Sequence, residues 1–502
     1  MTSNLLLALL SGLLLVLAFP RFDIDWLAAV ALAPLLMAAG REPSPWRRIL
    51  LGEVAGIVYW AGTCYWIQFV LEYHGNMGLV GSWGAFALFC LAKSLHLAAF
   101  TWLAGYLLAS PHAIISIAAL WVGIERTHAP LGFAWLALGN AGINMGLPMR
   151  LAPLVGVYGL SFVMAMLNAA MASVLLRRPR RRLGWLALLL VIPLLPALPE
   201  PGPGREQAVV VQSNVAMEEH FTTASAAETR DELARLSLQA ALAPDQPPVR
   251  LIIWPEVPLP LYYEQDAQFR RQANLLARAA EAWFLFGTVA FTPEGAPLNS
   301  AQLVSPAGEP AGRYDKIYLV PFGEFVPPYF GWVNRITREA GDFAPGRQIV
   351  VSPVGAHRIG AFICYESAFP HLVRRFAAAG AELLVNLSND GYFGTTAARE
   401  QHLLIARMRA AENRRWLVRA TNNVITCSID PLGRIRGQLE PFARLAARLY
   451  FDYETALAPY TRYGDWFAWL CLAVSLGAVV LSQRPRYRAE GRTGAPGGST
   501  AV

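Results

Sequence analysis

The stretch "LPALPEPGPG", residues 195–204, divides this chain of 502 residues into two parts of different character. Its prolines and glycines cannot continue a regular helix, so it predicts a linker. Before it, long apolar segments follow one another. After it, short segments rich in β-branched residues alternate with segments of helical periodicity. The chain is therefore expected to join an apolar helical part to a part built from strands and helices.

The composition indicates that the first part lies in lipid. Apolar residues make up 55% of the chain and charged residues only 15%, whereas soluble domains have about 25% charged residues. The mean hydropathy is +0.36. A hydrocarbon core of about 30 Å needs roughly 17–25 apolar residues per helix. Eight membrane spans are predicted, at residues 4–19, 25–40, 50–72, 77–108, 111–127, 151–176, 182–199 and 464–482.

The arginines indicate the orientation of these spans. The net charge of +7 does not point to nucleic acid, because the basic residues gather at the ends of apolar segments. The basic clusters are residues 41–48, "RRPRRR" at 177–182 and the tail from Arg484 onward. Because basic loops stay in the cytoplasm, both termini are expected there and the domain after the linker on the opposite, outward side, which for a bacterial inner membrane is the periplasm.

The predicted domain boundaries follow from this topology. They are transmembrane helices one to seven at 1–199, a linker at 200–204, a periplasmic domain at 205–455, the eighth helix with its approach at 456–482, and a disordered cytoplasmic tail at 483–502.

The periplasmic part reads as an α/β domain. Strands separated by amphipathic helices imply a layered α/β fold, and about 250 residues suffice for an independent core. Strands are predicted at 207–215, 250–256, 283–291, 358–366, 381–390 and 416–430, helices at 226–243, 266–282 and 397–415, and a hairpin around 305–313.

Three polar residues of this domain end apolar strands or follow them closely: Glu256, Lys316 and Cys364. Reactive groups of α/β sheets tend to lie at such strand ends. Lys316 is one of only two lysines beside 40 arginines, the other being Lys93. Lysine is a compact point charge with rotatable donors, whereas arginine is a planar fork. This pattern indicates a site that requires an ammonium, which would favour a thiolate and an oxyanion.

The three residue types suit covalent catalysis. A free thiol has a pKa near 8.5 and is mostly protonated at neutral pH, so a neighbouring carboxylate such as Glu256 is needed as a base. Taken singly, each residue has an ordinary alternative: a small core cysteine, a capping or surface glutamate, and a solvated lysine. A disulfide between Cys364 and Cys427 is a further alternative. Neither a CxxC pair nor a Cys/His spacing indicates a metal site.

Several ordered motifs together resemble the nitrilase, or carbon–nitrogen hydrolase, superfamily and its membrane-bound branch, the apolipoprotein N-acyltransferase family. The motifs are "IIWPE" (252–256), "YDKIYLVPFGEFVP" (314–327), "ICYE" (363–366), "SNDGYFG" (388–394), "QHLLIARMRAAENRR" (401–415), "RATNN" (419–423) and "APYTRYGDW" (458–466). The resemblance covers the whole chain and implies an αββα sandwich inserted between the seventh and eighth helices.

The resemblance also implies residue roles. It gives Glu256 as general base, Lys316 as stabiliser of the tetrahedral intermediate and Cys364 as nucleophile. Supporting roles fall to Glu324, Tyr365 and Glu366, and substrate contacts to Phe221, Asn389 and Tyr392. Phe221 and Tyr392 stand where tryptophan is common in the family, so the side-chain contacts with the acyl chain are expected to differ in detail from those of other members.

The implied reaction is a ping-pong acyl transfer. An acyl chain of a phospholipid, typically phosphatidylethanolamine, would pass through a thioester to the amine of a diacylglyceryl-cysteine at the N-terminus of an apolipoprotein. The resemblance implies a monomer without cofactor or metal. A membrane-tethered amidase and a transporter with an inert nitrilase-like domain are the competing readings. The transporter would need paired intramembrane charges, for which Glu53, Lys93 and Glu125 are too sparse.

One apolar stretch of the helical part lies on the same outer side. "APLGFAWLALGNAGINMGLP" (129–148) is interrupted by glycine and proline. It is expected to form either an interfacial platform or an irregular connector between helices. Lys93 is expected to snorkel or to make a hydrogen bond within the helix packing.

Overall fold

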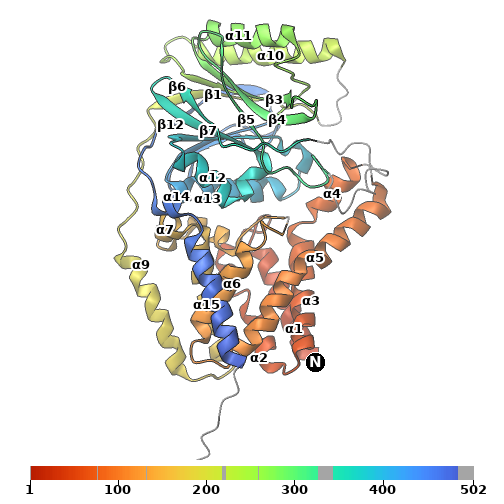
Figure 1. Ribbon diagram of the computed structural model, residues 1–502, viewed down its shortest axis with the longest axis vertical. Helices are drawn as coiled ribbons and strands as arrows, with labels where there is room; N and C mark the ends of the chain where they lie inside the picture. Colours follow the sequence, from red (N-terminus) through yellow and green to blue (C-terminus); the bar gives the residue numbers. More distant parts are fainter. Residues whose placement is uncertain are drawn as a thin grey trace, which may run out of the picture.

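The computed structural model describes residues 2–75, 77–131, 133–216, 222–257, 259–325 and 343–483. Figure 1 shows a bundle of helices below and a layered α/β domain above it. The chain passes from the bundle to the upper domain along residues 195–205 and returns into the bundle through α15 (Trp466–Gln483). The predicted tail beyond residue 483 lies outside the described residues.

Helices occupy each of the eight ranges in which spans were predicted. They are α1 (Thr2–Leu17), η1 (Asp25–Ala29), α2 (Ala33–Arg41), α3 (Pro45–Thr63), α4 (Trp66–Tyr73), α5 (Gly78–Leu107), α6 (Ala113–Arg126), α8 (Val157–Leu175), η4 (Arg180–Leu190), α9 (Val191–Leu194) and α15. Among the described residues, α5, α8 and α15 are long and apolar enough to cross a membrane singly, and α3 with α4 forms a fourth candidate.

Four predicted ranges are less regular than a single helix. The range 151–176 is interrupted at Gly156, between α7 (Ala152–Val155) and α8. The range 25–40 is split into η1 and α2, and the range 182–199 is mostly the 3₁₀ helix η4. The range 50–72 bends by 58° between α3 and α4. A distant residue contacts the chain at this bend. The Thr63 carbonyl oxygen, at the end of α3, accepts a hydrogen bond from the Gln401 side chain at 2.9 Å. The hydropathy of a segment does not report long-range contacts of this kind, so it could not predict the bend.

The connection between α6 and α8 is irregular. It contains η2 (Leu138–Asn144), η3 (Pro148–Leu151) and α7 (Ala152–Val155), while residues 133–137 form neither helix nor strand. This segment corresponds to the stretch at 129–148, and it packs between the bundle and the upper domain. The irregular connector between helices is confirmed, whereas the interfacial platform stays a prediction.

The upper domain contains two six-stranded sheets. The first has the order β12-β1-β2-β3-β4-β5 and the second the order β11-β10-β9-β8-β7-β6. The strands of the first sheet are β1 (Glu206–Gln212), β2 (Leu251–Ile253), β3 (Trp283–Phe291), β4 (Pro297–Val304), β5 (Pro310–Asp315) and β12 (Leu445–Phe451); those of the second are β6 (Val351–Val354), β7 (His357–Ile363), β8 (Leu383–Ser388), β9 (Trp416–Thr421), β10 (Cys427–Ile429) and β11 (Ile435–Gln438).

The middle strands of each sheet are parallel, and antiparallel strands flank them. In the first sheet β1, β2 and β3 run parallel, and in the second β7, β8 and β9 do so. Every residue of β8 and β9 is buried, as expected for parallel strands covered on both faces. The predicted hairpin around 305–313 is the β4–β5 connection. The predicted strand 416–430 is instead two antiparallel strands, β9 and β10.

Helices cover the outer face of each sheet. The helices α10 (Thr223–Ala241) and α11 (Ala267–Ala279) lie over the first sheet, and α12 (Pro370–Ala378) and α13 (Ala398–Asn413) lie between the second sheet and the bundle (Figure 1). The side chain of Asp266 begins α11 by accepting two backbone N–H groups, as helix-capping residues do. The α/β domain is therefore a four-layered αββα sandwich.

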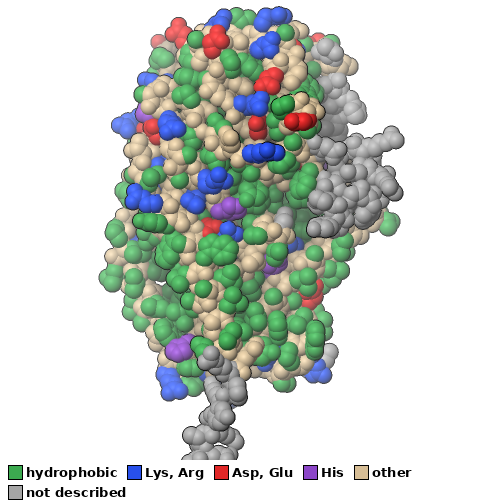
Figure 2. Space-filling view, viewed as in Figure 1, with side chains coloured by type: hydrophobic (Ala, Val, Ile, Leu, Met, Phe, Trp, Pro, Cys, Tyr) green, Lys and Arg blue, Asp and Glu red, His purple; other side chains and the backbone are tan. Residues whose placement is uncertain are grey.

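The surface follows the same division. Figure 2 shows acidic and basic side chains gathered on the upper domain, while the visible face of the bundle is mostly apolar, with basic groups at its lower end. Exposed leucines and valines of α15, such as Leu476, Val480 and Leu481, contribute to this surface. An apolar belt of this kind is stable only in contact with lipid or a partner.

Candidate active site

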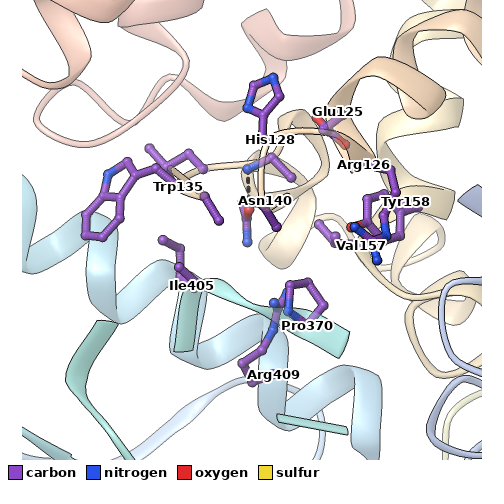
Figure 3. A pocket seen from close by; sticks show the side chains of 15 residues that line it. Glu125, Arg126, His128, Trp135, Asn140, Val157, Tyr158, Pro370, Ile405 and Arg409 are labelled. Carbon is purple, nitrogen blue, oxygen red and sulfur yellow. Dashed lines mark hydrogen bonds between the residues drawn. The ribbon is translucent and has the colours of Figure 1, made fainter. Parts of the chain in front are cut away.

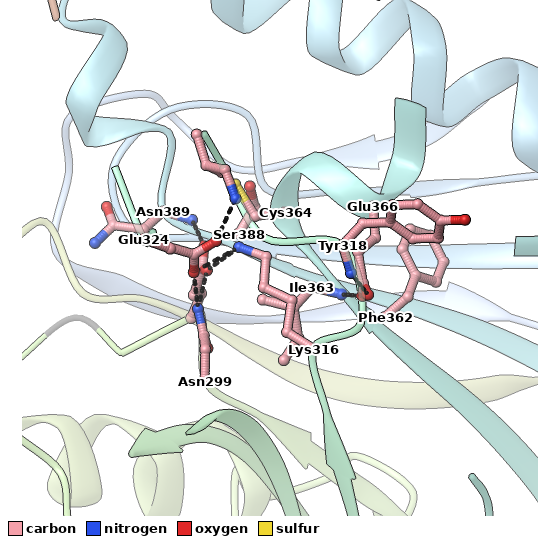
Figure 4. Close-up of polar contacts among 12 residues, drawn as sticks. Asn299, Lys316, Tyr318, Glu324, Phe362, Ile363, Cys364, Glu366, Ser388 and Asn389 are labelled. Atoms are coloured by element: carbon pink, nitrogen blue, oxygen red, sulfur yellow. Dashed lines mark hydrogen bonds and ion pairs between the residues drawn. The ribbon is translucent and has the colours of Figure 1, made fainter. Parts of the chain in front are cut away.

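The three residues singled out in the sequence come from both sheets. Glu256 follows β2, Lys316 follows β5 and Cys364 follows β7. Each lies just beyond the end of its strand, where the two packed sheets open toward the same rim. Figure 4 shows the end of the Lys316 side chain pointing toward Glu324, with Cys364 and Ser388 close by. The residues expected to meet are thus neighbours in the fold.

Lys316 is held between two carboxylates. Its ammonium lies 3.1 Å from Glu256 Oε1 and 2.9 Å from Glu324 Oε1, and only 1% of the side chain is exposed. Burial alone would lower the pKa of Lys316, but Glu256, Glu324 and Cys364 outweigh that effect and raise it well above its usual value. The lysine is therefore a fixed positive charge.

The two carboxylates are themselves held by neutral donors. The Asn299 side-chain amide donates to Glu256 Oε1 at 2.8 Å and to Glu324 Oε1 at 2.6 Å. The backbone N–H of Asn389 donates to Glu256 Oε2, and that of Val320 donates to Glu324 Oε2, both at 2.8 Å. Because buried charges need such partners, Asn299 is part of the site. No sequence motif pointed to Asn299.

Cys364 lies at a strained turn between β7 and the 3₁₀ helix η6 (Cys364–Ala368). Its φ of 50° is in the left-handed region, which costs a side-chain-bearing residue free energy and often occurs at functional sites. All five cysteines are free, which excludes the Cys364–Cys427 disulfide, and Cys364 alone is partly exposed. The turn therefore carries the one cysteine of the five that is not fully buried.

The electrostatics keep this thiol protonated in the resting site. Burial raises the pKa of Cys364 above its usual value and Glu256 raises it further, while Lys316 and a hydrogen bond with Ser388 act in the opposite direction. A thiol of this kind needs a base at the moment of reaction. Glu256, which acts on it electrostatically, is the neighbouring carboxylate.

A buried charge network fixes the backbone of Cys364 from behind. His402 contacts the Cys364 carbonyl oxygen through Nε2 at 3.0 Å and Asp390 through Nδ1 at 2.9 Å. Asp390 also pairs with Arg419 and accepts a hydrogen bond from Ser388 at 2.7 Å. The sequence motifs contained these residues, but only the fold shows that they converge beneath the thiol.

Glu366 and Tyr365 connect the cysteine turn to its surroundings. Glu366 accepts hydrogen bonds from the Tyr314 hydroxyl and from the backbone N–H groups of Ile317, Tyr318 and Ile363. It thereby ties the turn after Lys316 to the strand that ends at Cys364. The Tyr365 hydroxyl accepts a hydrogen bond from the backbone N–H of Ala134, in the helical part, at 3.1 Å.

The residues expected to contact substrate have different positions. The Asn389 side chain is engaged internally, with Gly391 and Asn422. Tyr392 is 43% exposed and packs edge-on against His74, just beyond α4. Phe221 lies outside the described residues. Of the two members of this group that the structure describes, Tyr392 is therefore the one available to a ligand.

A small cavity lies between the bundle and the α/β domain. Its volume is about 30 Å³, and Glu125, Trp135, Tyr158 and Arg409 are among its lining residues (Figure 3). Glu256, Lys316 and Cys364 do not line it. A space of this size holds about one water molecule, so the cavity is too small for an acyl chain. The described residues contain no group of three or more His, Cys, Asp or Glu side chains placed to hold a metal.

An αββα sandwich with a Glu–Lys–Cys cluster, joined to an apolar helical bundle, defines a membrane-associated enzyme of the carbon–nitrogen hydrolase type. The carbon–nitrogen hydrolase family matches residues 208–449, and the apolipoprotein N-acyltransferase N-terminal domain matches residues 11–170.

Two full-length relatives agree with this class. The chain is 36% identical to the apolipoprotein N-acyltransferase of Geobacter metallireducens, over 95% of this chain and 94% of that protein. It is 34% identical to that of Azotobacter vinelandii, over 97% and 96% of the two chains. The chain belongs to the apolipoprotein N-acyltransferase family.

Solved structures with a similar fold cover about half of this chain. A mutant of the Nesterenkonia AN1 amidase from the nitrilase superfamily is 20% identical to the chain, with a TM-score of 0.40, and the match covers 52% of this chain and 95% of the amidase.

Proposed function

We propose that Cys364 accepts an acyl chain from a phospholipid and passes it to the N-terminal amine of a diacylated apolipoprotein. The observation that carries this proposal is the single partly exposed cysteine beside a buried Lys316 that is fixed by Glu256 and Glu324. Membership of the acyltransferase family supplies the reaction class. Phosphatidylethanolamine is the proposed donor.

In the first half-reaction the thiol attacks the ester carbonyl of the phospholipid. Glu256 takes the proton of Cys364 as the sulfur–carbon bond forms, since the resting thiol is protonated. The negative charge that develops on the carbonyl oxygen faces the Lys316 ammonium. Collapse of the tetrahedral intermediate breaks the ester bond, and the lysophospholipid leaves with the proton returned by Glu256. A thioester remains on Cys364.

In the second half-reaction the amine of the apolipoprotein attacks this thioester. Glu256 takes a proton from the amine, an amide forms, and the Cys364 thiolate leaves and is reprotonated. Dividing the transfer into two steps lets one pocket serve both substrates in turn. Fixed donors at the oxyanion contribute about 10²–10³ each in rate. No metal or cofactor takes part in these steps.

The neighbouring residues have positioning roles in this proposal. Glu324 and Asn299 orient Lys316, and Glu366 holds the loop after Lys316 against the cysteine turn. Tyr365 aligns that turn with the helical part. Tyr392 contacts the substrate chain from the exposed side, together with Phe221, and Asn389 holds Glu256 through its backbone N–H.

The proposed topology places the α/β domain in the periplasm, with both termini in the cytoplasm, eight spans, and the sandwich inserted between the seventh and the eighth. The arginine clusters at 41–48 and 177–182 support this orientation. Both substrates are lipids, and exposing a chain to water costs about 0.8 kcal/mol per CH₂ group. A site close to the bilayer avoids that cost. The protein is proposed to act as a monomer.

Intact mass spectrometry tests the proposal. The full-length protein in mixed micelles with phosphatidylethanolamine is expected to gain the mass of one acyl chain, and a diacylglyceryl lipopeptide is expected to remove it. Cys364→Ala should show neither event. Transfer of the acyl chain to the lipopeptide by folded Cys364→Ala would exclude the proposed nucleophile. Release as free fatty acid without an acceptor would instead indicate a hydrolase.

A further inference from the structure

Lys93, the second lysine of the chain, takes no part in the proposed chemistry. It lies in α5 with 5% of its surface exposed. Its ammonium donates a hydrogen bond to the Phe133 carbonyl oxygen at 3.0 Å. It also lies 5.0 Å from the Trp60 ring centre and 5.8 Å from that of Phe133. Among the described residues, the ion pairs of lysine all belong to Lys316.

A buried cation without a carboxylate partner needs another source of stabilisation. Here the carbonyl oxygen and two aromatic faces provide it, through charge-assisted hydrogen bonding and cation–π attraction. An apolar residue would pack at this position of α5 without such requirements. The contacts of Lys93 therefore indicate that this residue holds the segment that contains Phe133.

That segment, Phe133–Ala134–Trp135, is called the aromatic shelf below. It has no regular secondary structure, although backbone groups in apolar surroundings need hydrogen-bond partners. Each of its residues is held by a different element. Lys93 binds the Phe133 carbonyl, the Ala134 N–H donates to Tyr365, and the Trp135 indole donates to Gln401 at 2.8 Å.

The shelf supports the residue that follows the nucleophile. The Tyr365 ring stacks against Phe133 with a centre-to-centre distance of 6.0 Å and an interplanar angle of 27°. It also stacks near Trp135, at 6.4 Å and 24°. Because Tyr365 directly follows Cys364, a shift of the shelf shifts the strained cysteine turn. A continuous series of contacts thus runs from Lys93 through Phe133 and Tyr365 to the thiol.

We propose that Lys93 is a positioning residue for acyl transfer, which holds the aromatic shelf against Tyr365 and so aligns Cys364 with Glu256 and Lys316. The inference rests on the proposed role of Cys364. It predicts that Lys93 affects the rate at which the thioester forms, in addition to any effect on folding. Misplacement of a reacting group by about 1 Å lowers a rate by about 10²-fold.

The test compares Lys93→Met, Lys93→Arg and Thr101→Val in the full-length protein. Thr101 is the matched control, since it is a buried polar residue of α5 that bonds only to Leu97 of the same helix. The rate of acyl-enzyme formation from phosphatidylethanolamine is followed by rapid quenching and intact mass spectrometry. Lys93→Met is expected to slow it by about 10- to 100-fold, Lys93→Arg to restore most of the rate, and Thr101→Val to match the wild type.

A double-mutant cycle separates positioning from general stability. Tyr365→Leu removes both the hydroxyl and the ring through which the shelf contacts the cysteine turn, so Lys93→Met should slow this variant much less than it slows the wild type. An unchanged rate in folded Lys93→Met, or the full slowing in the Tyr365→Leu background, would overturn the inference. If Lys93→Met does not fold, Lys93→Gln replaces it, and a wild-type rate in that variant has the same consequence.

The two proposals fail in different ways. If wild-type protein forms no thioester on Cys364, the proposed function is wrong. If the thioester forms on Cys364 at the same rate with and without Lys93, only the positioning role is wrong.

Discussion

Lys316 shows why one lysine persists among 40 arginines. Its single nitrogen contacts Glu256 and Glu324 at 3.1 and 2.9 Å while remaining within electrostatic reach of Cys364. A guanidinium spreads its charge over a larger plane and donates in a fixed fork. The two carboxylates and the thiol would have to move apart to receive it. This position therefore requires a cation that is small and free to rotate, in addition to a positive charge.

Lys316→Arg is accordingly expected to lose activity although its charge is kept. The rate of thioester formation on Cys364 should fall by about 10²–10³, the loss typical of removing one oxyanion donor. Quench-flow measurement with phosphatidylethanolamine micelles checks this, with thermal unfolding as the control for folding. A folded arginine variant within tenfold of the wild-type rate would show that any cation suffices.

The network beneath the thiol can be tested by the effect of an Asp390 variant on the free energy of unfolding. Burial alone would raise its pKa, but Arg419 and His402 outweigh burial and hold the pKa of Asp390 well below its usual value. Asp390→Asn leaves Arg419 buried without its counter-charge, so we expect a loss of about 3–5 kcal/mol at pH 7.

The pH dependence of this loss has a definite sign. A carboxyl group whose pKa is lowered by folding stabilises the protein above its unfolded pKa of about 3.9, and this contribution disappears as the pH falls further. The gap in unfolding temperature between wild type and Asp390→Asn should therefore narrow below pH 4. Unfolding scans from pH 7 to 2.5 measure it. If the difference in unfolding temperature stays constant from pH 7 to 2.5, the ionised Asp390 carboxylate is not the cause of the stability difference.

At the scale of elements, α13 joins the catalytic turn to the bundle. His402 faces Cys364, while the preceding residue, Gln401, faces the helices. The Gln401 side chain accepts hydrogen bonds from the Trp66 and Trp135 indoles and donates to the carbonyl oxygens of Pro20 and Thr63. Three distant segments, around Pro20, Thr63–Trp66 and Trp135, thus meet on one buried amide.

Gln401→Leu should consequently destabilise the whole protein. It leaves two carbonyl oxygens and two indole N–H groups buried without partners, at about 1–3 kcal/mol each. We expect a total loss of at least about 3 kcal/mol, seen as a lower unfolding temperature in detergent. Gln239→Leu on the exposed face of α10 is the matched control, expected within about 0.5 kcal/mol of the wild type. Equal unfolding temperatures for the two variants would contradict the joining role of α13.

The sequence predicted most elements, because hydrophobic periodicity is a local property. The strands predicted at 207–215, 250–256, 283–291, 358–366 and 381–390 and the hairpin near residue 309 were confirmed, whereas the strand predicted at 416–430 is two strands, β9 and β10. The bend between α3 and α4 was missed because Gln401, which receives the end of α3, is 338 residues away from Thr63. Asn299 was missed for the same reason: it lies in an antiparallel strand without a motif, and only sheet packing brings it to Glu256.

At the scale of the molecule, the last helix is fixed where it leaves the α/β domain. Asp465 pairs with Arg126 of α6 at 2.6 Å and accepts a hydrogen bond from the Tyr460 hydroxyl at 2.8 Å. Gly464 has a φ of 66°, and a side chain there would collide with Arg374. The motif at 458–466 is thus a rigid joint rather than a flexible tether. Such a joint lets the bundle and the sandwich form one continuous surface around the site.

The proposed orientation of this surface predicts a labelling pattern. Arg271 is exposed on α11 in the α/β domain, and Arg181 is exposed in the basic segment at the opposite end. The four other cysteines are buried, so Cys364→Ala gives a background with little native labelling. A membrane-impermeant maleimide added to spheroplasts should modify Arg271→Cys, whereas Arg181→Cys should react only after the membrane is opened. The reverse pattern would place the α/β domain in the cytoplasm, where the arginine clusters would then lie on the wrong side.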